Sequence, residues 1–226
     1  MTEQISVTNY KDKNIHEDEN NKSSVYLMDC YDLMKQIPDK YFDLLIADPP
    51  YVPLEENTGR IRTTGNKQSS IALGGQPDKK VFDEMFRVSK HQIIWGANNF
   101  GYPFQGFIVW EKTNIPDDFT MSRCEIASLS KELSRVSKMV RLSSASTQDH
   151  KRIHPTEKPI ELYSWVFNKY AKKGWKLFDP FLGSGNSRIA ADKHGLEFIG
   201  CELDETFFNA HVKMWGTYKS QFKLFF

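Results

Sequence analysis

The chain has 226 residues, with 39% hydrophobic and 26% charged side chains and a formal net charge of +1. This length suits one α/β domain with insertions, and no apolar stretch is long enough to span a membrane. The balanced charge neither requires nor excludes a nucleic-acid partner. Cys30, Cys124 and Cys201 are scattered without metal-ligand spacing, and the polar N-terminus has no signal-peptide pattern. We therefore expect a cytoplasmic protein without a metal site.

Strand-like and helix-like patterns alternate along the chain, after a charged N-terminal segment of residues 1–22 that is predicted to be flexible. Residues 23–226 are predicted to form a single domain, in which the polar segment 52–80 is a mobile or functional loop. The predicted strands cover residues 25–29, 42–47, 92–96, 106–110, 125–129, 135–142, 175–178 and 197–201. The predicted helical segments cover residues 30–37, 81–88, 159–170 and 186–194. This alternation predicts an α/β fold with a largely parallel central sheet flanked by helices.

The tetrapeptide Asp48-Pro49-Pro50-Tyr51 directly follows the predicted strand 42–47. An acid, two prolines and an aromatic at the carboxyl end of a strand make a rigid polar pocket where open α/β sheets bind ligands. Proline lacks an N–H and fixes φ, so a carbonyl in this segment is held rigidly. The alternative is a turn that only terminates the strand.

A glycine-rich turn, Gly183-Ser184-Gly185, follows Asp179 and the predicted strand 175–178. Glycines let the backbone approach a ligand closely, and the helix predicted from Asn186 offers free N–H groups. Roughly twenty residues later Glu202 closes the next strand, where an acid can accept both hydroxyls of a ribose. Asp179 would repel a pyrophosphate but suits the ammonium of S-adenosylmethionine. A simple strand-to-helix turn is the alternative.

These motifs resemble those of DNA amino-methyltransferases. The segment 179–185 resembles their cofactor motif D-P-F-x-G-S-G, and residues 48–51 resemble their catalytic D-P-P-Y. Residues 154–159, His-Pro-Thr-Glu-Lys-Pro, resemble their H-P-T-x-K-P segment. The catalytic motif precedes the cofactor motif, as in the circularly permuted β group. The resemblance covers residues 25–212 and implies a Rossmann-like methyltransferase fold with S-adenosylmethionine as the cofactor.

The resemblance also implies roles for individual residues, with catalytic roles for Asp48, Pro49, Pro50 and Tyr51. Thr156 and Lys158 are expected near the carboxylate of the cofactor, and Asp29-Cys30 near its adenine. A packing or capping His154 and a solvated Lys158 are the alternatives. Asn186 stands where the family usually has Thr, and Asn can still cap the helix and donate a hydrogen bond. The implied cofactor-binding set is Asp29, Cys30, Asp48, His154, Thr156, Lys158, Asp179, Phe181, Gly183, Ser184, Gly185, Asn186, Glu202 and Leu203.

Basic residues on both sides of the candidate pocket predict contacts with a phosphate backbone, although ordinary surface charge is the alternative. They are Arg60, Arg62, Lys67, Arg135, Lys138, Arg141, Lys151 and Arg152. Residues 111–153 are the candidate target-recognition insertion, which is short for a helix or ribbon that reads several base pairs in the major groove. The specificity is therefore expected to be short or relaxed, unless a second subunit of a homodimer contributes.

Six other positions are less informative. Trp95 and Trp110 are predicted core residues rather than base-stacking ones. Asn98 and Asn99 follow a strand at the expected rim of the pocket, without an assigned role. The pair Glu111-Lys112 is weakly expected on the side of the target base.

The expected chemistry is transfer of a methyl group to an exocyclic amino group in DNA. Such a nitrogen is a poor nucleophile because its lone pair is delocalised, and acceptors at its two N–H bonds favour the tetrahedral geometry needed for in-line attack. Asp48 and a carbonyl of Pro49-Pro50 are the expected acceptors, Tyr51 offers a stacking face, and the base must be flipped out or single-stranded. The resemblance implies adenine N6 as the target, because the cytosine enzymes of that family more often carry Ser in the first position of this motif. N4-cytosine methylation and a non-catalytic nucleic-acid-binding module are the alternatives.

Overall fold

The computed structural model describes residues 15–18, 20, 22–51, 75–102, 105–119, 122–145 and 157–223, with side chains to residue 221. In this part of the chain, strands form one nine-stranded sheet in the order β1-β2-β9-β8-β3-β4-β6-β5-β7. The strands are β1 (Ile15–Glu17), β2 (Ser23–Leu27), β3 (Phe42–Ala47), β4 (Ser89–Trp95), β5 (Gly106–Lys112), β6 (Cys124–Leu129), β7 (Lys138–Leu142), β8 (Lys176–Asp179) and β9 (Glu197–Glu202).

The central strands β2, β9, β8, β3 and β4 all run in the same direction. Strand β6 is antiparallel to both β4 and β5, so β5 runs in the direction of the central strands and β7 is parallel to it. The short β1 is antiparallel to β2 at the other end of the sheet. The carboxyl ends of β2, β9, β8, β3, β4 and β5 therefore meet at one edge, where β6 begins.

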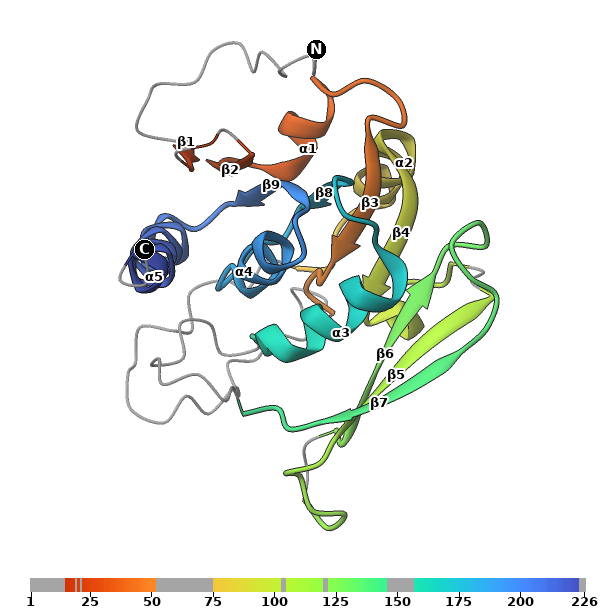
Figure 1. Ribbon diagram of the computed structural model, residues 1–226. Helices are drawn as coiled ribbons and strands as arrows, with labels where there is room; N and C mark the ends of the chain where they lie inside the picture. Colours follow the sequence, from red (N-terminus) through yellow and green to blue (C-terminus); the bar gives the residue numbers. More distant parts are fainter. Residues whose placement is uncertain are drawn as a thin grey trace.

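Helices cover both faces of the sheet. Helices α1 (Cys30–Met34) and α2 (Lys79–Val88) lie on one face, and α3 (Ile160–Tyr170), α4 (Asn186–Lys193) and α5 (Glu205–Lys223) lie on the other (Figure 1). A short 3₁₀ helix, η3 (Ala97–Asn99), follows β4. Alternation along β3 supplies both cores, because Leu44 and Ile46 pack on the α3–α5 side while Leu45 and Ala47 pack on the α1–α2 side.

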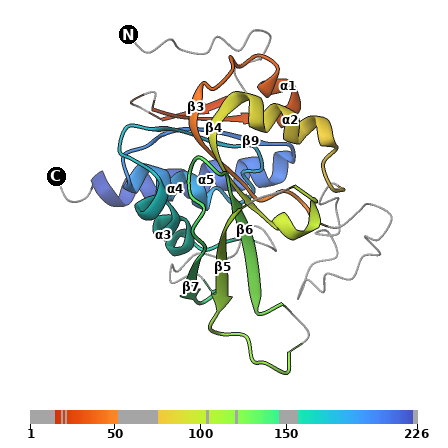
Figure 2. The same ribbon diagram turned by 90° about the vertical axis from the view of Figure 1, so that its right-hand side faces the viewer.

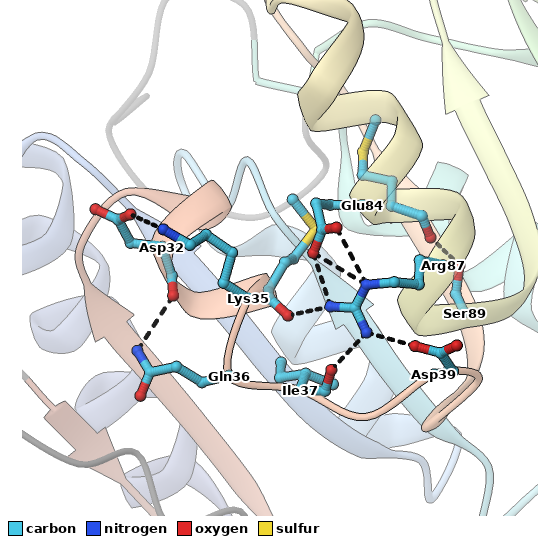
Figure 3. A network of polar contacts seen from close by, with 10 residues as sticks. Asp32, Lys35, Gln36, Ile37, Asp39, Glu84, Arg87 and Ser89 are labelled. Atoms are coloured by element: carbon cyan, nitrogen blue, oxygen red, sulfur yellow. Dashed lines mark hydrogen bonds and ion pairs between the residues drawn. The ribbon is translucent and has the colours of Figure 1, made fainter.

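Arg87 near the end of α2 ties this helix to the end of α1 (Figure 3). Its guanidinium donates to the carbonyl oxygens of Met34 at 2.7 Å and Ile37 at 2.8 Å. It also pairs with Glu84 and Asp39, each at 2.7 Å. The last carbonyls of a helix have no intrahelical donor, so Arg87 adds a partner to the Met34 carbonyl at the end of α1 and one to the Ile37 carbonyl in the turn that follows.

The predicted fold class is confirmed, with a mostly parallel sheet between two helical layers. Strand β3 has the predicted bounds, and the other predicted strands and helices are present with small shifts. The prediction of flexibility was wrong for residues 15–17, which pair with β2 as β1. Helix α5 was not predicted. Trp95 and Trp110 are buried in the core, as predicted.

The segment after residue 110 belongs to the same sheet. The described residues 122–145 contain β6 and β7, and together with β5 these strands extend beyond the helical layers (Figure 2). Most of the predicted loop, residues 52–74, lies outside the described residues. In the described part of the chain, no helix is both long and apolar enough to cross a membrane.

Candidate active site

Asp48 follows β3 at the edge where the parallel strands end. Its Oδ2 lies 2.5 Å from the Nζ of Lys158, and its Oδ1 accepts a hydrogen bond from the Tyr51 hydroxyl. The same ammonium lies 3.1 Å from the Tyr51 oxygen. The structure therefore brings the predicted catalytic acid, the aromatic of the same motif and a distant lysine into direct contact.

Lys158 is only 3% exposed, which excludes the solvated alternative. Its Nζ also lies 3.1 Å from Oε2 of Glu125, whose Oε1 pairs with Lys112 at 2.6 Å. Burial alone would lower the pKa of Lys158, but Asp48 and Glu125 outweigh this effect and the pKa is raised. Lys158 therefore remains an ammonium at neutral pH and does not act as a proton acceptor.

Tyr51 lies against the backbone of β4's end. A Cβ added to Gly96 would lie 2.2 Å from the Tyr51 ring, so the ring occupies the space that the glycine leaves free. Phe100 contacts the ring edge-on, with the ring centroids 6.2 Å apart. Burial and the neighbouring Asp48 raise the pKa of the phenol, so Tyr51 stays protonated and its hydroxyl donates to Asp48.

Asp179 ends β8, which pairs with β3, so the cofactor motif and the catalytic motif leave adjacent parallel strands. Its Oδ1 accepts from the backbone N–H of Phe181 at 3.0 Å, and its Oδ2 from the Ser187 hydroxyl at 2.5 Å. Burial raises the pKa of this carboxyl to about 7, despite the opposing effect of these hydrogen bonds. A cationic ligand beside Asp179 would favour the ionised form.

Glu202 holds the glycine loop in place from the end of β9. Its Oε2 accepts from the N–H of Gly183 at 2.8 Å, and its Oε1 from the N–H of Asp204 at 2.9 Å. Burial raises the pKa of Glu202. Strand β2 pairs with β9 so that Leu27 lies opposite Glu202, which brings Asp29 to the same edge. Glu202 at the end of β9 and Asp29 after β2 thus lie on neighbouring strands, and their contacts to a nucleoside stay a prediction.

Asp29 caps helix α1 by accepting the N–H of Tyr31 at 2.7 Å. Cys30 is buried, and burial with the nearby Asp29 raises the pKa of its thiol to about 12. Cys30 is therefore a packing residue rather than a nucleophile. Leu203, by contrast, is 71% exposed next to Glu202 and is free to contact a ligand.

The prediction that Asn186 caps α4 was wrong. Gly185 is the cap residue, and Asn186 is the first residue of the helix. The Asn186 Nδ2 donates to the carbonyl of Lys158 at 2.8 Å, which joins the two motif regions. Its buried Oδ1 has no hydrogen-bond partner among the described residues. A ligand with an ammonium group would satisfy this acceptor, so the site fits the amino-acid end of S-adenosylmethionine.

Other predicted site residues are only partly placed. His154, Thr156 and the basic residues Arg60, Arg62, Lys67, Lys151 and Arg152 lie outside the described residues. Arg135, Lys138 and Arg141 are exposed. Lys138 and Arg141 are three positions apart on the edge strand β7 and so point to opposite faces. These three residues are not part of the Asp48 site, and their role in DNA binding stays a prediction.

Sequence reasoning missed Glu125 and underestimated Lys112. Both are charged residues in apolar strands, near the ends of β6 and β5 that lie at the ligand-binding edge. Lys112 is only 8% exposed. Each is a charged residue at an alternating, core-facing position of its own strand, and this was the signal available in the sequence. Glu111 points away and pairs instead with Arg123 at 2.7 Å and Arg141 at 2.8 Å.

Comparisons with known proteins point to one family. The N6/N4 DNA methylase model matches residues 77–213, which are more than half of the chain. Type II methyltransferase M.HinfI from Haemophilus influenzae is 24% identical over 82% of this chain and 66% of its own length.

Solved structures share the fold. The M1.HpyAVI–SAM complex aligns with a TM-score of 0.57 at 20% identity, over 84% of this chain and 98% of that one. The cytosine-N4-specific PvuII DNA methyltransferase aligns with a TM-score of 0.57 at 12% identity, over 84% of each chain. Since the family model spans more than half of the sequence and includes the cofactor loop, the chain belongs to the N6/N4 DNA methylase family.

Proposed function

We propose that this protein transfers a methyl group from S-adenosylmethionine to the exocyclic N6 of adenine in DNA. One observation carries the proposal. The Asp48 carboxylate and the Asp179–Gly185 loop leave the carboxyl ends of two paired parallel strands, β3 and β8. An acceptor for an amino group is thereby placed beside a loop suited to a nucleoside with an ammonium group.

The cofactor would be held by residues at the ends of β8 and β9 and at the start of α4. Asp179 and the unpartnered Oδ1 of Asn186 suit its ammonium, and Glu202 suits the ribose hydroxyls. The N–H groups at the start of α4 would suit its carboxylate. Lys158 is already paired with Asp48 and Glu125, so its predicted contact with that carboxylate requires a rearrangement. When bound, the cofactor supplies an electrophilic methyl group on a sulfonium.

The protein's own residues would activate the amino group. Asp48 accepts one N–H bond, and a rigid carbonyl of Pro49-Pro50 accepts the other, which favours a tetrahedral nitrogen and stabilises the positive charge that develops on it. Both oxygens of Asp48 are bonded in this structure, to Tyr51 and to Lys158. The target amino group must therefore add to, or replace, one of these contacts.

The proposed DNA contacts lie outside the Asp48 site. A base in a duplex must leave the stack to reach Asp48, at a cost of a few kcal/mol that phosphate contacts offset. The exposed Arg135, Lys138 and Arg141 are candidates within the described part of the chain. The short segment between β5 and α3 favours a short or relaxed recognition sequence, unless a homodimer extends it.

The direct test is incubation with DNA and isotopically labelled S-adenosylmethionine, followed by digestion to nucleosides and mass spectrometry. Labelled N6-methyladenine supports the proposal. Labelled N4-methylcytosine would show that the target base is cytosine rather than adenine, with the same mechanism. Absence of any labelled base, on single-stranded and double-stranded DNA, would refute it.

Asp48→Asn is expected to reduce the rate constant of transfer by at least about 100-fold, because it removes the negative charge that stabilises the developing cation. Binding of S-adenosylmethionine, measured by calorimetry, should change little. Asp43→Asn is the matched control, since Asp43 is a partly buried, ion-paired acid at the opposite end of β3. Loss of cofactor binding in Asp48→Asn would show that the two sites are wrongly assigned.

A further inference from the structure

Four charged residues form a continuous chain of ion pairs that ends on Asp48. Lys112 pairs with Glu125 at 2.6 Å, Glu125 with Lys158 at 3.1 Å, and Lys158 with Asp48 at 2.5 Å. The charges alternate in sign and sum to zero. Lys112 and Lys158 are almost completely buried, so water contributes little to the solvation of either ammonium.

The strand directions explain how this chain forms. Asp48 follows β3, and Lys112 ends β5, which runs in the same direction as β3. Glu125 lies at the start of β6, which runs in the opposite direction, so it reaches the same edge of the sheet. Trp110 lies opposite Glu125 in the β5–β6 ladder. Residues far apart in the sequence thereby meet where the strands end.

Lys158 is shared between two carboxylates, and this sharing determines how strongly it holds Asp48. With Glu125 present, the ammonium divides its attraction between both acids. Without Glu125, the buried ammonium would have Asp48 as its sole carboxylate among the described contacts. Asp48 would then be drawn towards Lys158 and would be a weaker acceptor for another N–H bond.

We propose that Glu125 is a positioning residue for methyl transfer, which holds the Lys158 ammonium so that the Asp48 carboxylate keeps its orientation and its free acceptor capacity for the target amino group. Lys112 supports this role by orienting Glu125. The inference rests on the proposed function, because it concerns the same reaction at Asp48. It adds a residue outside the three sequence motifs.

Glu111, on the neighbouring strand β5, provides a control. It is also held by two basic side chains, Arg123 and Arg141, and its side chain is 14% exposed compared with 21% for Glu125. Its described ion pairs do not include Lys158 or Asp48. Of the two glutamates, Glu125 is the one whose described ion pairs lead to the catalytic acid.

The experiment compares Glu125→Gln with Glu111→Gln in the full chain, using steady-state methyl transfer to DNA. Glu125→Gln is expected to lower kcat about 10- to 100-fold, the scale of a small displacement of a reacting group. The KM for S-adenosylmethionine should change less than about threefold, since Glu125 has no described contact with Asp179, Asn186 or Glu202, the residues proposed to hold the cofactor. Glu111→Gln should retain the wild-type kcat. Equal kcat values for wild type and folded Glu125→Gln would refute the inference.

The pH dependence gives a second readout that a purely structural role would not change. The groups facing Lys158 are Asp48, Glu125 and Tyr51, with Tyr163 of α3 interacting with both acids. Asp48 and Glu125 raise the pKa of Lys158, so loss of Glu125 lowers it. The decline of kcat at alkaline pH should therefore occur at a lower pH in Glu125→Gln. An unchanged alkaline limb would count against the inference.

Lys112→Met keeps the inference testable if Glu125→Gln does not fold. It removes the ion pair that orients Glu125, so Glu125 holds the Lys158 ammonium less firmly in place, and kcat is expected to fall about 3- to 10-fold. A wild-type kcat in Lys112→Met, with Glu125→Gln unfolded, would refute the inference. Methyl transfer by the wild type distinguishes failure of the proposed function from failure of this inference. A wild type that produces no methylated base contradicts the proposed function. An active wild type with an equally active Glu125→Gln contradicts the role of Glu125 alone.

Discussion

At the scale of single residues, Gly185 shows how the cofactor loop depends on a missing side chain. Its φ is +77°, and a Cβ at this position would lie 1.8 Å from Nδ1 of His211. His211 is itself buried, in α5, with Nδ1 3.3 Å from the carbonyl oxygen of Ser184. The loop, the cap of α4 and α5 therefore meet at a point where a side chain does not fit.

Gly185→Ala is expected to be more destabilising than Gly174→Ala. Gly174 also has a positive φ, +83°, but open space around it, so its substitution costs about 1–2 kcal/mol of backbone strain alone. The clash with His211 should add about 1–3 kcal/mol at Gly185. Urea denaturation of both variants measures the difference. Equal midpoints would show that α5 moves away from the loop without cost.

At the scale of secondary structure, Arg87 joins α2 to the end of α1 and to the turn after it through backbone carbonyl groups. Arg87→Ala removes one donor from each of the Met34 and Ile37 carbonyls, of which Met34 also accepts from the Ile37 N–H at 3.0 Å. The expected loss in free energy of unfolding is about 2–4 kcal/mol, since the bonds of a charged donor contribute about 1.5–3 kcal/mol each and water reaches part of the site. Lys79→Ala, in the first turn of the same helix, breaks only the exposed pair with Asp83 and should change little. Similar losses in the two variants would contradict this role of Arg87.

The helices and strands differ in how well the sequence alone predicts them. Strand β3 was predicted with its bounds because its apolar run ends at two prolines. Helix α5 was missed although Phe208, His211 and Trp215 recur at helical spacing and are buried. Strand β1 could not be predicted, because its three residues carry no strand pattern of their own. Their strand conformation depends on pairing with β2.

At the scale of the whole molecule, Arg188 of α4 connects both ends of the chain. Its guanidinium donates to Ser23 of β2 at 2.7 Å and contacts ring nitrogens of His16 in β1 at 2.9 Å and His211 in α5 at 3.1 Å. It also lies 4.0 Å from the centre of the Trp215 ring. A guanidinium only donates, so Nε2 of His211 accepts from it, and Nδ1 carries the proton that Ser184 accepts.

The neutral state of His211 makes stability depend on pH. Burial and Arg188 lower its pKa to about 3, from 6.5 in an unfolded chain, and the pKa of His16 is lowered for the same reasons. The unfolded state therefore binds protons first, and the stability present above pH 6.5 is lost as the pH falls towards 3. At pH 5 the loss from His211 alone is about 2 kcal/mol.

His211→Gln keeps a neutral side chain and should flatten this dependence by about one proton, as measured by urea denaturation between pH 7 and pH 5. His194→Gln is the control, because His194 is a partly exposed histidine that bonds within its own helix. An unchanged slope in His211→Gln would show that His211 is not the titrating group.

The sequence by itself determined the parts of this protein that depend on neighbours along the chain. The strand before Asp48, the glycine turn after Asp179 and the acid at Glu202 were readable because each combines a strand end with residues of restricted or unusual backbone geometry. These motifs were enough to predict the methyltransferase-like fold and a nucleoside-binding edge, and the family match agrees with them.

Only the tertiary structure decided which charged groups surround Asp48. Lys158 is 110 positions away in the sequence, Glu125 lies on an antiparallel strand and Lys112 on its neighbour, and no local pattern shows that these charges meet at Asp48. They meet because parallel strands end at one edge and β6 begins there. Burial then makes their ion pairs strong, since water no longer screens the charges.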